Sequence, residues 1–240
     1  MSLEIYLILG AISLITSMIT AIFSVGGGMI MLASLGQFVG ASALIPLHAS
    51  VQLLNNISRV YVYKEHINFG ILKTILWASF IGSLIAIFIF QNLDEYILTL
   101  IIGCSILFLT WVPINKFIKH GLANDLICGL LAGVAGIFIG ANGPIVTAFM
   151  RLKSLSPESL VANHGLVMVF QHSIKIILFI SVIGFSLLSY IPLIVFLGLM
   201  GYLGTNVGKR LIDKIDFKLF QTVLKFLLSV LAILLILRAE

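Results

Sequence analysis

The sequence predicts an all-α polytopic membrane protein made of two inverted repeats, each with four apolar segments. Three observations support this fold class. The 240 residues are 60% hydrophobic and 10% charged, with a mean hydropathy of +1.20. Apolar runs close to the roughly 20 residues that a helix needs to cross a bilayer recur along the chain. Each half also contains one apolar run that is interrupted by helix-breaking residues at a matching position. Soluble folds do not bury this much apolar surface.

In the first half, the apolar run at residues 3–36 is interrupted by Ser24-Val25-Gly26-Gly27-Gly28. A more polar helix is expected next at 46–62, followed by continuous spans at 71–90 and 97–113. The second half has the same order: an interrupted run at 129–149, a more polar helix at 159–183, and spans at 187–207 and 217–237. About eight segments result. The predicted domains are a first transmembrane repeat at 1–114, a cytoplasmic linker at 115–124 and a second transmembrane repeat at 125–240.

The two interruptions align with each other, since "GIFIGANGPI" at 136–145 lies over "AIFSVGGGMI" at 21–30. A bilayer normally demands continuous backbone hydrogen bonding. Matched breaks in the two halves of a membrane protein point to a transport site.

The loop charges favour a model in which each broken segment enters and leaves the membrane on the same side. All ten loop cations then become cytoplasmic, in agreement with the positive-inside rule. The ten residues are Lys64, Lys73, Lys116, Lys119, Arg151, Lys153, Lys209, Arg210, Lys214 and Lys218. This topology makes the second repeat inverted relative to the first. A conventional count stays open as well, because residues 3–25 alone are long enough to span.

A polar stripe follows each break. In the first copy, His48, Gln52, Asn55 and Arg59 fall on one face of the predicted helix. In the second copy the corresponding positions are His164, Met168, Gln171 and Lys175, with His172 beside them. Ionisable side chains inside membrane helices are costly and usually face the protein interior or a water-filled path.

Every Asp and Glu lies at a terminus or beside a loop, so none is placed to neutralise Arg59 or Lys175 at depth. A buried cation without a carboxylate needs another anion. The breaks fit this interpretation, because the start of a half-helix presents free N–H groups and the positive end of the helix dipole. Pro144 is suited to the first position of such a helix. We therefore expect an anionic substrate.

The predicted substrate-binding residues combine the two breaks with the two stripes: Gly26, Gly27, Gly28, Gln52, Asn55, Asn56, Arg59, Asn142, Gly143, Pro144, Gln171 and Lys175. His48, His164 and His172 are candidates for proton coupling, because an unperturbed imidazole titrates near pH 6.5. Two alternatives stay open. The glycines can serve close helix packing alone, and Arg59 is near enough to the cytoplasmic face to extend to the membrane surface. Lys175 lies deeper and is the better ligand candidate.

Other classes of function fit poorly. The chain offers no nucleophile arrangement, no cluster of metal ligands and no intramembrane acid pair, so we expect neither an enzyme nor a metal or cofactor site. The basic residues lie in short loops, where they set orientation, so nucleic-acid binding is not expected. The expected partners are a small anion and the lipid bilayer of the cytoplasmic membrane. Assembly into a homo-oligomer stays open.

Four stretches carry a resemblance: "SVGGGMIML", "HASVQLLNNISRVYVY", "GIFIGANGPIVTAFM" and "NHGLVMVFQHSIK". They resemble the two repeats of the sulfite exporter TauE/SafE family, also called the toluene sulfonate uptake permease family, over nearly the whole chain. The resemblance implies a prokaryotic-type permease for sulfite, thiosulfate, sulfoacetate or other organosulfonates, driven by the proton gradient. We expect alternating access; a passive anion channel or a membrane subunit of a larger assembly is the alternative. Ala33 replaces a proline frequent in the family, and Ala141-Asn142 replaces a glycine-richer run, which leaves the particular anion open.

Overall fold

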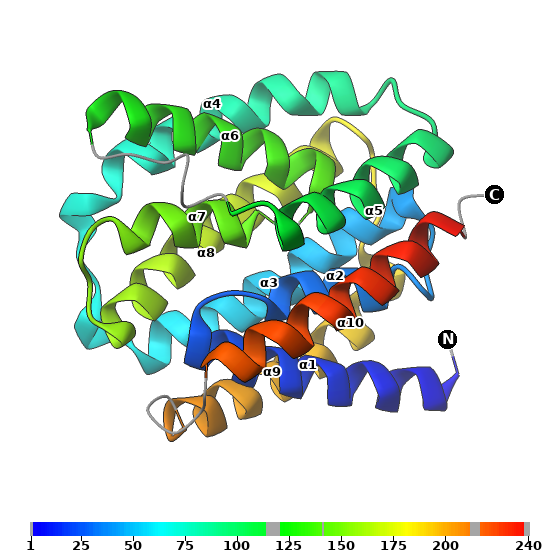
Figure 1. Cartoon of the computed structure of the whole chain (residues 1–240). Helices are drawn as coiled ribbons and strands as arrows, with labels where there is room; N and C mark the ends of the chain where they lie inside the picture. The colour runs from blue at the N-terminus through cyan, green and yellow to red at the C-terminus, as the bar shows by residue number, and fades with distance from the viewer. Residues whose placement is uncertain (1, 114–120, 141, 212–216, 238–240) are drawn as a thin grey trace.

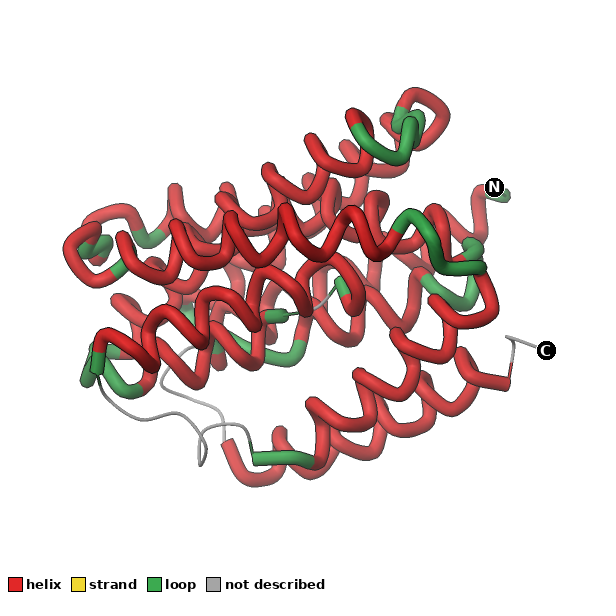
Figure 2. Tube along the Cα trace, turned by 90° about the horizontal axis from the view of Figure 1, so that it is seen from above, coloured by secondary structure: helices red, strands yellow, loops and turns green. Residues whose placement is uncertain are grey.

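The computed structural model describes residues 2–113, 121–140, 142–211 and 217–237, and the regular structure within these ranges is helical throughout (Figure 2). The first half contains α1 (Leu3–Phe23), α2 (Gly27–Leu35), α3 (Ala41–Val62), α4 (Lys73–Phe90) and α5 (Glu95–Trp111). The second half contains α6 (Leu122–Ile139), α7 (Gly143–Arg151), α8 (Pro157–Ser181), α9 (Ile191–Lys209) and α10 (Phe217–Leu237). Short 3₁₀ turns at Lys64–His66, Phe69–Ile71 and Leu188–Tyr190 join some of them.

Five helical stretches of the described chain are long and apolar enough to cross a membrane: Leu3–Phe23, Lys73–Phe90, Leu122–Ile139, Pro157–Ser181 and Leu188–Lys209. Two shorter apolar helices, Glu95–Trp111 and Thr222–Leu237, accompany them. The chain is thus a multi-pass membrane protein with an all-helical fold. The inverted relation of the halves and the count of eight segments stay predictions.

Some boundaries differ from those expected. Helix α3 begins at Ala41 rather than at Pro46, which lies inside it. Pro46 is the sixth residue of the helix, where its missing N–H forfeits a single backbone bond without ending the helix. Helix α6 begins at Leu122, inside the predicted linker, whose residues 115–120 lie outside the described ranges. The loop cations Lys116, Lys119 and Lys214 also lie outside them, and no side chain is described for Lys218.

Helices of the first half of the described chain pack on helices of the second half (Figure 1). Helix α1 packs on α9, α4 on α6, α3 on α8 and α5 on α10. The first two pairs approach closely through glycine. A Cβ at Gly204 would overlap the Leu14 carbonyl oxygen, and one at Gly133 would overlap the Ser79 carbonyl oxygen. Small residues allow this proximity in membrane helices. The α3–α8 pair lies between the α1–α9 pair and the α4–α6 pair, since α3 also contacts α9 and α8 also contacts α4.

Both predicted breaks are present. Helix α1 ends before Ser24, and Gly26 has a φ of 98° before α2 begins at Gly27. Helix α6 ends before Gly140, whose φ is 78°, and α7 begins at Gly143. Glycine adopts such a φ without the Cβ clash of other residues. Pro144 is the second residue of α7 rather than the first, and Ala141 lies outside the described residues.

Candidate functional site

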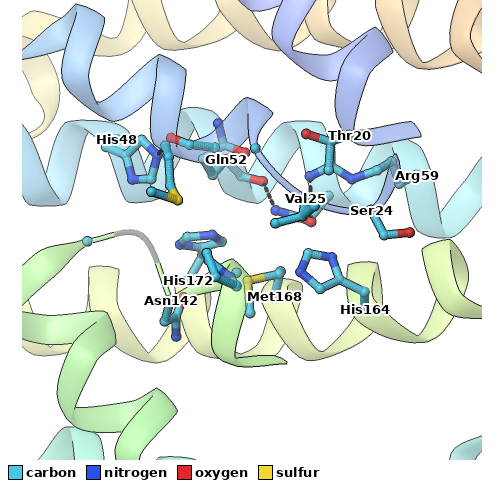
Figure 3. Close-up of a pocket in the computed structure, with 17 residues that line it drawn as sticks. Thr20, Ser24, Val25, His48, Gln52, Arg59, Asn142, His164, Met168 and His172 are labelled. Carbon is cyan, nitrogen blue, oxygen red and sulfur yellow. Dashed lines mark hydrogen bonds between the residues drawn. The ribbon is translucent and has the colours of Figure 1, made fainter. Parts of the chain in front are cut away.

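A small cavity of about 30 Å³ lies where the two breaks meet α3 and α8 (Figure 3). Figure 3 shows His48, Gln52 and Arg59 of α3 on one side and His164, Met168 and His172 of α8 on the other. This volume exceeds the roughly 10–15 Å³ that one water molecule needs. The described lining residues are Thr20, Ser24, Val25, Gly26, Gly28, Met29, His48, Gln52, Asn56, Arg59, Gly140, Asn142, Gly143, Pro144, His164, Met168 and His172.

The cavity brings together most of the residues expected from sequence: Gly26, Gly28, Gln52, Asn56, Arg59, Asn142, Gly143, Pro144, His48, His164 and His172. Gly27, Asn55, Gln171 and Lys175 are absent from the described lining. Thr20, Ser24, Val25, Met29 and Gly140 line the cavity without having been expected, and Met168 belonged to the second stripe without being assigned as a ligand. In the sequence, these residues lie in or near a break or on a polar stripe. Such a position alone does not tell which side chains face the cavity.

Arg59 supplies the formal positive charge of the described lining. Its side chain is buried, with 2% of its surface exposed, so it does not extend to the membrane surface. Its Nη2 donates to Asn56 Oδ1 at 2.6 Å, and its Nε has no hydrogen-bond partner. The described lining contains no carboxylate. A buried guanidinium with a free donor and no acid beside it favours an anionic ligand.

Three buried histidines add further unpaired groups. His48 Nε2 lies 2.9 Å from the Gly28 carbonyl oxygen, which makes this nitrogen the donor, and its Nδ1 is unpaired. The His48 and His172 rings meet edge to face with centroids 5.9 Å apart. Both ring nitrogens of His164 and Nδ1 of His172 also lack partners. Buried polar atoms in native proteins are normally hydrogen-bonded, so this group of unpaired atoms indicates a site for a polar ligand.

Two helix N-termini meet at the same cavity. Helix α2 begins at Gly27 and α7 begins at Gly143, and Gly28 and Gly143 both line the space. The first N–H groups of a helix have no partner within the helix. Together with the positive end of the helix dipole, they favour an anion.

Gly27 and Asn55 lie behind the cavity and hold helices together. A Cβ at Gly27 would overlap the Thr16 carbonyl oxygen of α1. Asn55 donates from Nδ2 to Ser13 Oγ at 3.4 Å, and its amide packs against Gly201 of α9. These two residues have structural contacts on the side of α1 and α9.

Gln171 and Lys175 contact the second break. Asn142 Nδ2 donates to the Gln171 side-chain oxygen and, at 2.7 Å, to the Ala132 carbonyl oxygen. Lys175 Nζ donates to the Gly140 carbonyl oxygen at 2.9 Å. Helix α8 therefore holds the chain on both sides of this break.

The two breaks are also linked to each other. Thr147 of α7 donates its hydroxyl to the carbonyl oxygen of Ser24 at 3.0 Å. Ser24 has a φ of 62°, which is uncommon for a residue other than glycine. Its N–H donates to the Thr20 carbonyl at 2.9 Å, so the backbone of this residue is bonded on both sides.

Comparison with protein families gives a match over nearly the whole chain. The family model described as sulfite exporter TauE/SafE matches residues 9–235, which include both breaks, both polar helices and the whole described lining of the cavity. No curated protein and no solved structure matches the chain.

Proposed function

Because the chain belongs to the sulfite exporter TauE/SafE family, we propose that it is a permease for small sulfur-containing anions in the cytoplasmic membrane. Sulfite, thiosulfate, sulfoacetate and other organosulfonates are the candidate substrates. The observation that carries the proposal is the buried cavity lined by Arg59, by unpaired histidine nitrogens and by two helix N-termini, with no carboxylate in its described lining. Each of these groups stabilises negative charge.

The anion lies between the two breaks in this proposal. Amides near Gly28 and Gly143 contact its oxygens from opposite ends, and Arg59 supplies the compensating charge. Gln52, Asn56 and Asn142 complete the polar lining. A carboxylate at this place would repel the substrate, so the described lining suits an anion better than a metal cation.

The proposed mechanism is alternating access between two inverted repeats. In the two repeats, α1 corresponds to α6 and α4 corresponds to α9. The α1–α9 contact therefore corresponds to the α6–α4 contact, and both contacts are present. The α3–α8 and α5–α10 pairs map onto themselves under the same correspondence. This pattern is expected when a pseudo-two-fold axis relates the halves, and rocking of one half against the other then exposes the cavity to each side in turn.

Proton coupling through histidine is part of the proposal. His48, His164 and His172 are buried around the cavity and have unpaired ring nitrogens. A histidine that binds a proton together with the anion offsets the substrate charge and links transport to the pH gradient.

The test is anion flux in proteoliposomes adsorbed to a solid-supported membrane. Sulfite, thiosulfate, sulfoacetate, taurine, sulfate and alanine are applied with and without a pH gradient. We expect a saturable current for sulfur oxyanions or sulfonates. Its KM should rise about tenfold or more in Arg59→Gln and stay unchanged in Lys64→Gln, which removes an exposed cation near the same helix end. A current that does not saturate would favour the channel alternative. Absence of both current and labelled uptake for all six compounds in sealed vesicles would refute the proposal.

A further inference from the structure

The two stripe cations occupy equivalent positions but make different contacts. Arg59 and Lys175 follow His48 and His164 by the same spacing on α3 and α8. Arg59 lines the cavity and bonds Asn56 of its own helix. Lys175 does not belong to the described lining, and its Nζ reaches across to the carbonyl oxygen of Gly140 at 2.9 Å. Equivalent positions therefore do not imply equivalent roles.

The partner of Lys175 is the C-terminal end of α6. Gly140 is the residue that ends this helix, and a helix leaves its last carbonyls without backbone partners. These carbonyls carry the negative end of the helix dipole, which attracts a cation. The aliphatic part of Lys175 also lies against this end, because a Cβ at Gly136 would be 3.7 Å from Lys175 Cε.

Lys175 is buried, with 1% of its surface exposed, and has no salt-bridge partner among the described residues. Lys175 Nζ nevertheless has a hydrogen-bond partner, whereas Arg59 Nε has none. The end of α6 thus supplies the negative partner that no carboxylate provides. Of the two stripe cations, Arg59 is the one that lines the cavity with an unpaired nitrogen.

Helix α8 holds the second break from both flanks. Lys175 binds the carbonyl of Gly140 on the α6 side, and Gln171 accepts from Asn142 on the α7 side. At the first break, the described contacts are of another kind. His48 Nε2 binds the Gly28 carbonyl oxygen, and Thr147 of the other half binds the Ser24 carbonyl oxygen.

We propose that Lys175 is a positioning residue that fixes the second break against α8, and that Arg59 is the one of the two stripe cations that supplies its charge to the transported anion. The part concerning Arg59 rests on the proposed function, while the part concerning Lys175 does not need a substrate. Loss of Lys175 leaves the Gly140 carbonyl buried and unpaired, which loosens the start of α7. The amide of Gly143 and its neighbour His164, whose Nε2 would lie 3.6 Å from a Cβ at Gly143, then lose their fixed positions.

The first test measures amide hydrogen exchange of the full chain in lipid nanodiscs without substrate. We expect Lys175→Met to speed exchange in the peptide covering 143–151 by about tenfold or more, because a buried hydrogen bond is left unmade. Lys175→Gln keeps an N–H donor and should restore part of the protection. Arg59→Met is the matched control at the equivalent position of α3, and exchange in this peptide should stay at the wild-type rate. Exchange in Lys175→Met within about twofold of wild type would overturn the role assigned to Lys175.

The second test separates positioning from ligand binding through transport kinetics. Lys175→Gln should lower the turnover of sulfite with an apparent KM within about threefold of wild type, whereas Arg59→Gln should raise the KM by tenfold or more. An equal rise in KM for both variants would overturn the division of roles. If the wild-type protein transports none of the candidate anions, the proposed function fails, and hydrogen exchange still decides the role of Lys175. Should Lys175→Met not fold, as judged by size-exclusion chromatography, Lys175→Gln provides both readouts.

Discussion

Replacement of Arg59 by methionine tests the anion site most directly. The side chain is 2% exposed and its Nε has no partner, so an anion in the cavity can accept a hydrogen bond from it. Such a charge-assisted bond contributes about 1.5–3 kcal/mol. Two unit charges about 4 Å apart attract by about 4 kcal/mol at an effective dielectric constant of about 20. A loss of about 2–4 kcal/mol in binding follows, which corresponds to a roughly 30- to 700-fold rise in Kd.

The assay is equilibrium binding of labelled sulfite to the purified protein in nanodiscs, over a concentration range that extends about a thousandfold above the wild-type Kd. Lys64→Met is the matched control, because it removes the same charge from an exposed position beyond the end of α3. Its Kd should stay near that of the wild type. If Arg59→Met binds sulfite within about threefold of the wild type while remaining folded, the assignment of Arg59 as an anion ligand is refuted.

Three further predictions concern the fold. Thr147→Val should lower the free energy of unfolding in detergent by about 1–3 kcal/mol, because the Ser24 carbonyl of the first break loses its buried donor. Thr147→Ser keeps the hydroxyl and should have a melting temperature near that of the wild type. An unchanged melting temperature of the valine variant would contradict the argument. Gly133→Ala should cost about 3 kcal/mol through overlap with the backbone of α4. A Cβ at Gly184 would meet open space, so Gly184→Ala should lower the free energy of unfolding by only about 1 kcal/mol, because of the positive φ of this residue. Equal losses of stability in the two alanine variants would count against the packing argument. Cysteines placed singly at Lys64 and Lys153, in a chain without its native cysteines, should both react with an impermeant maleimide from the cytoplasmic side only; labelling from opposite sides would disprove the inverted topology.

The breaks were predictable because their cause is local. A membrane helix rarely tolerates a run such as Gly26-Gly27-Gly28, and the left-handed φ of Gly26 and of Gly140 agrees with the residue type. The start of α3 was not predictable from Pro46, since proline is also tolerated near the beginning of a helix.

The candidate site was predictable only in part. Asn55 belongs to the first polar stripe, yet its side chain bonds Ser13, whereas the next residue, Asn56, lines the cavity. Thr20 and Ser24 continue a row of hydroxyl residues at helical spacing that includes Ser13, Thr16 and Ser17, so the sequence contained a periodic signal for them. The contact between Lys175 and Gly140 depends on the path of the chain after α6, and this path cannot be deduced from the spacing of a stripe.

The pairing of helices across the two halves has a consequence for biosynthesis. Ser13 in α1 donates to the Leu197 carbonyl of α9 at 2.7 Å, and these residues are 184 positions apart in the chain. Translation at about 5–20 residues per second takes roughly 10–40 s to proceed from Ser13 to Leu197, so α1 is made well before α9. During this interval the Ser13 hydroxyl lacks the α9 carbonyl that accepts its hydrogen bond. A serine hydroxyl can meanwhile donate to a carbonyl of its own helix, as the hydroxyls of Thr16 and Thr20 do, so α1 can stay in the bilayer until α9 is made.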